Sequence, residues 1–154
     1  MLIESLKMSI SLNSFVAFIV YMLTSVILLA IHTKLYTMIT PHKEFQLIRD
    51  GKMAAAIALS GSIIGFAIPL AGVVSHSIAV LDVIIWGVIA SAVQLLVFFA
   101  ASRIIPQLSQ RIENNEFSSA IFVAALAIAV GMLNASAMTP DDHTTASQPE
   151  IIIK

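Results

Sequence analysis

Four long stretches of the chain contain no Asp, Glu, Lys or Arg, and they constrain its fold more than any other feature. They run from Met8 to Thr33, from Met53 to Leu81, from Val83 to Ser102 and from Phe117 to Pro140. A helix needs roughly 20 apolar residues to cross a hydrocarbon core about 30 Å thick, so each stretch is long enough to span a membrane. Inside lipid the backbone must satisfy its own hydrogen bonds, which favours helices.

Two other interpretations of the apolar stretches explain less. A cleaved signal peptide has an apolar core of about 7 to 15 residues and small residues at its cleavage site, whereas the first stretch is longer and Ala30-Ile31-His32 does not fit. A β-barrel alternates apolar and polar residues, and the run Val26 to Ile31 does not. We predict an all-α membrane protein with a domain at 1–138 and a flexible polar tail at 139–154. Its four transmembrane helices are expected near Ser14–Tyr36, Met53–Gly72, Val83–Ile104 and Phe117–Ala137.

The composition excludes several classes of function. Charged residues make up 11% of the chain, against roughly a quarter in soluble domains, and the net charge of -1 gives no basic surface for nucleic acid. The chain has no cysteine, which excludes disulfides and thiolate chemistry. It carries no zinc-protease helix motif, phosphate-binding glycine loop or serine elbow. We therefore expect no enzyme activity, no catalytic residues, no cofactor and no metal. We expect Asp141, Asp142 and His143 to be solvated in the tail, with weak binding of a cation as the alternative.

Basic residues are distributed unevenly between the two sides of the predicted bundle. Six of the eight lie in the connections between the first and second and between the third and fourth spans, whereas Lys7 and Lys154 lie near the termini. The positive-inside rule places those two connections in the cytoplasm and both termini in the periplasm of a bacterial inner membrane. The six are Lys34, Lys43, Arg49, Lys52, Arg103 and Arg111.

The sequence repeats weakly at a spacing of 64 residues. This shift places Arg49–Ile57 over Glu113–Ile121, and both segments are polar turns followed by small residues. We predict two tandem helical hairpins, at about 14–73 and 83–138, in one orientation and related by an axis along the membrane normal. Convergent similarity between two membrane hairpins is the alternative. Pro41–Asp50 is expected to form a short helix on the membrane surface, with an ordinary loop as the alternative.

Four segments of the chain resemble the YjfL-like family of bacterial inner-membrane proteins, also described as domain of unknown function 350. The resemblance covers roughly Asn13 to Ala137 and implies four spans with no established activity. Family members often carry asparagine where Lys52 stands, and their gene neighbours imply an association with membrane stress or remodelling. The segments are Ile39–Ile48, Ala54–Leu70, Trp86–Gly87 and Gln94–Phe98.

Small residues form a stripe along the second span and another along the fourth. In lipid such faces associate by close packing, so we expect them to join helices within one chain or between subunits of a homo-oligomer. A substrate approaching the bare backbone is the alternative. The packing residues are Ala54, Ala58, Gly61, Gly65, Pro69, Ala127 and Gly131.

Polar side chains near the middle of three spans are expected to form one layer. Such residues most often join helices by hydrogen bonds, and the sharper alternative is a narrow polar pathway or a small-ligand site. His32, near the end of the first span, is expected to be an interfacial side chain rather than a proton relay. The layer residues are Thr24, Ser25, Ser60, Ser62, Ser91 and Gln94.

A second polar group flanks the central connection, where we single out His76, Asp82 and Trp86. Asp82, Trp86 and Gln94 recur at multiples of four residues, which predicts that Asp82 faces the same interior as Gln94. Capping of the third span by Asp82 is the alternative. Trp86 is expected to anchor the helix at the membrane interface.

We expect a non-enzymatic membrane module that contacts lipid, forms a homo-oligomer and binds a cytoplasmic partner through Glu44, Phe45, Leu47 and Ile48. The alternative is a small passive channel, or a pore for lipid or small solutes, lined by the polar layer. A coupled transporter is disfavoured, because the spans carry no charged side chains apart from Lys34 and Arg103 at helix ends.

Overall fold

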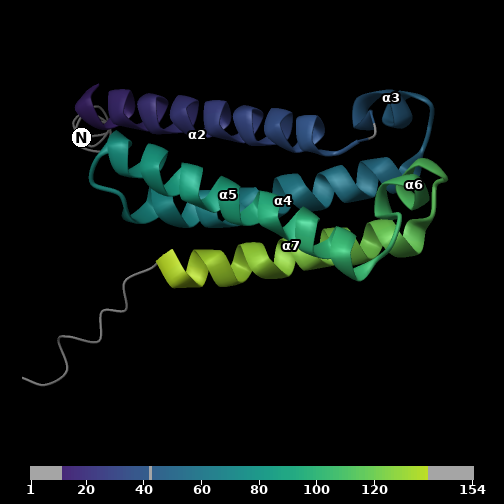
Figure 1. The fold of residues 1–154 in the computed structure, drawn as a ribbon. Coiled ribbons are helices and arrows are strands. Elements are labelled where there is room, and N and C mark those ends of the chain that lie inside the picture. The colour runs from purple at the N-terminus through teal and green to yellow at the C-terminus, as the bar shows by residue number, and fades with distance from the viewer. Residues whose placement is uncertain (1–11, 42, 139–154) are drawn as a thin grey trace, which may run out of the picture.

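A computed structural model describes residues 12–41 and 43–138, and all regular structure in these ranges is helical (Figure 1). Four of the helices are long and apolar enough to cross a membrane, which confirms the predicted all-helical fold with four candidate spans. The predicted tail at 139–154, with Asp141, Asp142 and His143, lies outside the described residues. In chain order the helices are α2 (Leu12–Ile39), α3 (Glu44–Arg49), α4 (Met53–His76), α5 (Val80–Ile104), α6 (Leu108–Glu113) and α7 (Phe117–Met138).

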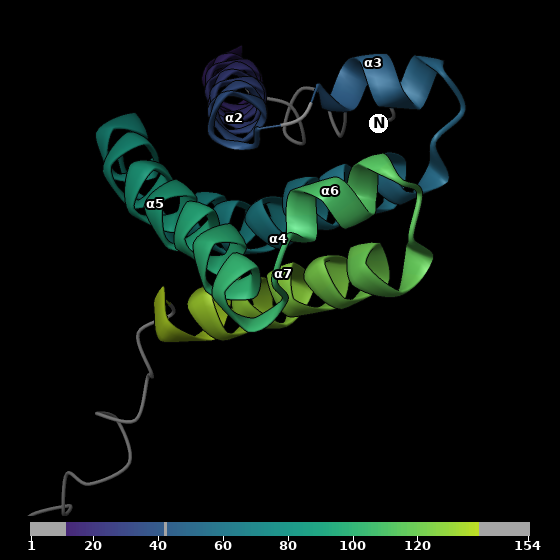
Figure 2. The same cartoon turned by 45° about the vertical axis from the view of Figure 1, so that its right-hand side comes forward.

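Helix α4 lies at the centre of the bundle and contacts each of the other five described helices (Figure 2). It packs most extensively on α7, and the two run in the same direction, because Gly61 faces Ala124 at one level and Gly72 faces Ala135 further along. Helix α2 is peripheral, since most of its side chains face outward. Helices α3 and α6 lie at one end of the bundle, called here the α3–α6 end, and the α4–α5 connection lies at the other, the hairpin end (Figure 1).

Two apolar clusters form the core. One lies toward the α3–α6 end and includes Tyr36, Phe98 and Ile112, with α6 contributing its buried face. The other lies toward the hairpin end and includes Phe66, Leu70, Val73 and Val83. Each short helix therefore turns an apolar side toward the bundle and covers its end.

The local structure repeats at the spacing of 64 residues found in the sequence. Helix α6 begins and ends 64 residues after α3, and α7 begins 64 residues after α4. The turns between them match: Gly51 has φ of 78° and Asn115 has φ of 65°, the left-handed conformation that glycine and asparagine adopt most readily. The relation of the two halves by an axis along the membrane normal stays a prediction.

The two turns are also joined to each other. The backbone N–H of Ala54, in the first turn of α4, donates to Asn115 Oδ1 at 2.9 Å. The first N–H groups of a helix have no partner inside it, so Asn115 caps α4 from the other half of the chain.

The short helix begins later than predicted, at Glu44 rather than Pro41. The helical hydrogen bonding of α2 continues to Thr40, whose N–H donates to Tyr36 O at 3.0 Å, and Lys43 has a non-helical ψ of 83°. Pro41 therefore follows the end of α2 instead of starting α3, a place that suits a residue unable to continue a helix.

Candidate functional site

The polar side chains in the middle of the bundle converge on His32 of α2. Its ring is 0% exposed, with Nδ1 2.9 Å from Ser91 Oγ on α5 and Nε2 3.2 Å from Ser62 Oγ on α4. One face of the ring stacks on Phe66 at a centroid distance of 4.3 Å. A neutral imidazole has one donor and one acceptor nitrogen, so it can satisfy both hydroxyls at once. His32 therefore joins α2 to α4 and α5.

This position corrects the expectation that His32 is an interfacial side chain. Helix α2 extends to Ile39, which leaves His32 seven residues, or about 10 Å, inside its end. The residues of α2 buried by the bundle are Leu28, His32 and Tyr36, spaced by four. That spacing was the signal in the sequence that could have located the ring.

Gln94 joins α5 to α7 next to the histidine cluster. Its Nε2 donates to Ala127 O at 2.7 Å, and the side chain is buried. The Gln94 side chain lies against Gly65 of α4, where an added Cβ would overlap the Gln94 amide nitrogen. Close contact of three helices at this point therefore depends on the absence of a side chain at position 65.

Only half of the predicted polar layer comes together. Ser62, Ser91 and Gln94 lie in the described core, whereas Ser60 is exposed. Thr24 and Ser25 donate to carbonyls of their own helix, four residues back and at 2.8 Å in each case. The physical reason is register: α2 is shifted along the bundle, so that His32, and not its central residues, lies level with Ser62 and Ser91.

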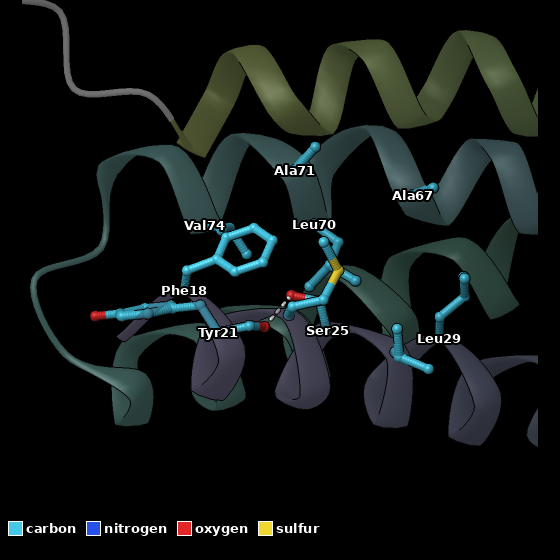
Figure 3. A pocket seen from close by; sticks show the side chains of 10 residues that line it. Phe18, Tyr21, Ser25, Leu29, Ala67, Leu70, Ala71 and Val74 are labelled. Atoms are coloured by element: carbon cyan, nitrogen blue, oxygen red, sulfur yellow. Dashed lines mark hydrogen bonds between the residues drawn. The ribbon is translucent and has the colours of Figure 1, made fainter. Parts of the chain in front are cut away.

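Ser25 instead lines an apolar groove of about 350 Å³ between α2 and α4 (Figure 3). Phe18 and Tyr21 lie on one wall, and Leu70 and Val74 on the other. The groove lies between two helices that are long and apolar enough to cross a membrane.

The small-residue stripe of α4 packs against that of α7 within one chain. A Cβ at Gly61 would overlap the backbone of Ala124, and one at Gly131 would overlap the Gly65 carbonyl. In a regular helix the N–H of residue 69 would donate to the carbonyl of Gly65. Pro69 has no N–H, so this hydrogen bond is absent and the Gly65 oxygen faces Gly131. Of the two arrangements expected for the stripe, packing within one chain is the one observed, because α7 covers it. The α4 members are Ala54, Ala58, Gly61, Gly65 and Pro69, and all are buried.

A buried polar stripe continues from His32 to the α3–α6 end and was missed in the sequence. It consists of His32, Tyr36, Thr40 and Glu44, and we call it the His32–Glu44 stripe. Tyr36 is 2% exposed and Glu44 1% exposed. Thr40 Oγ1 lies 3.0 Å from the Tyr36 carbonyl oxygen and also contacts Glu44 Oε1. The Tyr36 ring packs edge-on against Phe98, and its hydroxyl has no hydrogen-bond partner among the described residues.

The four residues expected to bind a partner do not share one surface. Glu44 is buried beneath α2, and Leu47 and Ile48 pack against the core cluster. Phe45 is 53% exposed. The expectation is corrected in this respect, because α3 directs its apolar side into the bundle and leaves Phe45 as the large apolar side chain on its outer side.

The residues singled out at the hairpin end also stay apart. His76 is exposed, and its Nδ1 lies 2.9 Å from Gly72 O. Asp82 accepts from the Ala79 N–H at 3.3 Å, which is the capping role. Trp86 is 46% exposed, so it does not face the interior with Gln94. Twelve residues at about 100° each leave a rotation of about 120° between Asp82 and Gln94, which explains the difference.

The chemistry open to the His32 cluster is limited. A ring nitrogen 2.9 Å from a serine hydroxyl resembles a base beside a nucleophile. However, the other nitrogen meets Ser62 rather than a carboxylate, and the backbone N–H of Ser91 belongs to a helix and cannot stabilise an oxyanion. Within residues 12–41 and 43–138, no three His, Asp or Glu side chains are placed to hold a metal ion.

Comparison with known proteins covers the whole described bundle. The family described as Domain of Unknown Function (DUF350) matches residues 9–138. The chain is 38% identical to the UPF0719 inner membrane protein YjfL of Escherichia coli (strain K12) over 128 residues, which are 83% of this chain and 97% of the relative. It is 29% identical to the UPF0719 transmembrane protein YshE of Bacillus subtilis (strain 168) over 126 residues, 78% of this chain and 90% of the relative. No solved structure matches at a significant level.

Proposed function

The chain belongs to the DUF350 family, and from this premise we propose that it is a non-enzymatic module that binds a partner protein at its cytoplasmic surface. It is a multi-pass inner-membrane protein with four candidate spans. The observation that supports partner binding is a groove outside the candidate spans, lined mainly by residues in and beside α3 and on its other side by Glu113 of α6.

We place the α3–α6 end in the cytoplasm and the termini in the periplasm. Six of the eight basic residues lie at the α3–α6 end or in the connections that form it, and positively charged connections are retained inside. A cysteine introduced at position 46 in the cysteine-free chain tests this orientation. If an impermeant thiol reagent added outside intact cells labels this cysteine, the orientation is the reverse of the one proposed.

The groove has a volume of about 320 Å³ and combines both signs of charge. Lys43 and Asp50 from the α3 side face Glu113 of α6 across it. Phe45 lies exposed on the same short helix. Charged residues around a groove with an aromatic anchor nearby are typical of a protein-binding surface, in which the aromatic side chain carries much of the affinity.

Site-specific photo-crosslinking in cells tests this proposal. A photoreactive residue at position 45 or 46 is expected to give a discrete protein adduct. The matched control is position 78 at the hairpin end, where Ile78 is 96% exposed. Phe45→Ala should weaken the adduct formed from position 46, whereas Ser109→Ala, its counterpart in the 64-residue repeat, should not. Identical adducts at 45 and 78, or none at 45 and 46, would refute it.

The channel alternative has weaker support. His32 occupies the space between Ser62 and Ser91, and Thr24, Ser25 and Ser60 do not join the layer. Proteoliposomes are expected to release no more trapped solute than protein-free vesicles. Release that His32→Leu abolishes would favour the pore instead.

Two further expectations stay predictions. A homo-oligomer would have to form through lipid-facing surfaces other than the α4–α7 stripe, because that stripe is covered within the chain. A link to envelope stress rests on the family resemblance.

A further inference from the structure

We propose that the His32–Glu44 stripe is a proton-binding path that opens toward the α3–α6 end and stops at His32. This inference is independent of the proposed partner binding. It assigns a ligand, the proton, to the buried ionisable groups of the bundle.

The first argument is burial at regular spacing. His32, Tyr36, Thr40 and Glu44 are four residues apart, and each is at least 95% buried. Along α2 this spacing is about 6 Å, so successive side chains are neighbours on one face. Ionisable residues inside a membrane bundle are costly, and where they occur they mark pathways for ions or protons.

The second argument is hydrogen bonding along the stripe. Thr40 Oγ1 can accept a proton from the Glu44 carboxyl while it donates to the Tyr36 carbonyl oxygen, so a proton on Glu44 has a defined acceptor. The Tyr36 hydroxyl is buried without a hydrogen-bond partner among the described residues. A buried hydroxyl left unpaired is unfavourable, and a water molecule that accepts from it and donates toward the stripe would satisfy it and could carry the proton.

His32 is the terminal acceptor. A neutral ring has one nitrogen that accepts from a serine hydroxyl, and when a proton binds there that hydroxyl rotates to accept instead. Both ring contacts, to Ser62 and Ser91, survive the change. No bond between heavy atoms forms or breaks, and the stripe gains one positive charge.

Few other charges face this group. Helix α4 presents Ser62 and Phe66 to the ring, and α5 presents Ser91 to the ring and Phe98 to Tyr36. The titratable side chains of these two helices lie near their ends, and Lys34 of α2 is exposed. Within the described residues, Glu44 is the buried carboxylate, and it lies three steps along the stripe from His32. The end residues are His76, Asp82 and Arg103.

The two ends of the stripe differ in access to water. At the α3–α6 end, a groove of about 570 Å³ is lined by Pro41, Glu113 and Phe98, and the Phe98 ring also packs against Tyr36 of the stripe. On the other side of His32, Leu28 begins the apolar cluster at the hairpin end. The path therefore admits protons from one side and does not cross the bundle.

The experiment follows hydrogen exchange of the His32 ring N–H by NMR. The full chain carries ¹⁵N-histidine in lipid nanodiscs, with the other three histidines, His42, His76 and His143, replaced by glutamine. On transfer to deuterated buffer, Tyr36→Phe and Glu44→Gln are each expected to slow exchange by about tenfold or more, which corresponds to ~1.4 kcal/mol in the barrier. Glu44→Asp, which retains a carboxyl group, should restore part of the rate.

The matched controls are Tyr21→Phe, the other tyrosine of the chain, on α2 toward the hairpin end, and Glu116→Gln, a half-exposed carboxylate beside α6 that pairs with Arg111 and lines neither groove of the α3–α6 end. Both should leave the rate unchanged. A purely structural role for Tyr36 and Glu44 predicts the opposite sign, because a loosened bundle exchanges faster. Unchanged or faster exchange in Tyr36→Phe and Glu44→Gln overturns the proposal, and so does equal slowing in Tyr21→Phe.

Discussion

Replacing Gly65 by alanine tests the contact between α4 and α7 most directly. The new Cβ would overlap the Gln94 amide nitrogen and come too close to Ala127 O, so α7 or the Gln94 side chain must move. Overpacking of a well-packed core costs about 1–3 kcal/mol. Loss of the hydrogen bond from Gln94 to Ala127 adds about 0.6 kcal/mol. Alanine regains about 1 kcal/mol of helix propensity over glycine, which leaves a net destabilisation of about 0.6–2.6 kcal/mol.

Gly72→Ala is the matched control. It lies on the same helix along the same contact, but a Cβ there meets no atom nearer than Ala135 Cβ, at 3.8 Å. This is ordinary van der Waals contact, so the substitution should be neutral or slightly stabilising. Titration with sodium dodecyl sulfate in mixed micelles measures both free energies of unfolding, with the single tryptophan, Trp86, as the fluorescent probe. Equal midpoints for Gly65→Ala and Gly72→Ala would refute the close approach of α4 and α7 at Gly65.

Three further predictions concern the histidine cluster and the two turns. His32→Leu should destabilise the bundle by about 1–3 kcal/mol in the same assay, from two interhelical hydrogen bonds of about 0.6 kcal/mol each and the stacking on Phe66; a double-mutant cycle with Ser91→Ala that gives no coupling would contradict the contact. Gly51→Ala should lower the free energy of unfolding by about 1–2 kcal/mol, because Gly51 has a left-handed backbone conformation. Gly51→Asn should be tolerated, since Asn115 adopts the same conformation in the matching turn. Equal destabilisation by the two substitutions would contradict this explanation. Asn115→Gly keeps the left-handed conformation but removes the acceptor of the Ala54 N–H, so thermal unfolding should show a loss of about 1 kcal/mol, and an unchanged melting temperature would disprove the cap.

The membrane fold could be predicted from the sequence because length and the absence of charge determine where a helix can cross lipid. The repeat was also visible, since Gly51 and Asn115 occupy a turn that few other residues tolerate. These are local properties, and each is set by residues close together in the chain.

The positions of side chains around the bundle were harder to predict. Assigning Thr24 and Ser25 to the polar layer assumed that all spans are centred at one depth, whereas α2 is shifted so that His32 meets Ser62 and Ser91. Glu44 was assigned to the surface because charged residues usually are, but the bend after Thr40 places its carboxyl beneath α2. Both errors have one cause: the register between helices depends on tertiary packing, which a single helix does not encode.

The parallel contact between α4 and α7 has a consequence for how the protein is made. Gly61 and Ala124 meet although they are 63 positions apart in the chain, and α7 is the last described helix to leave the ribosome. Until then the glycine face of α4 is without its partner and the Gln94 side chain lacks the Ala127 carbonyl. A nascent or truncated chain that ends before Phe117 would therefore expose both features, the bare glycine face of α4 and an unpaired amide on α5.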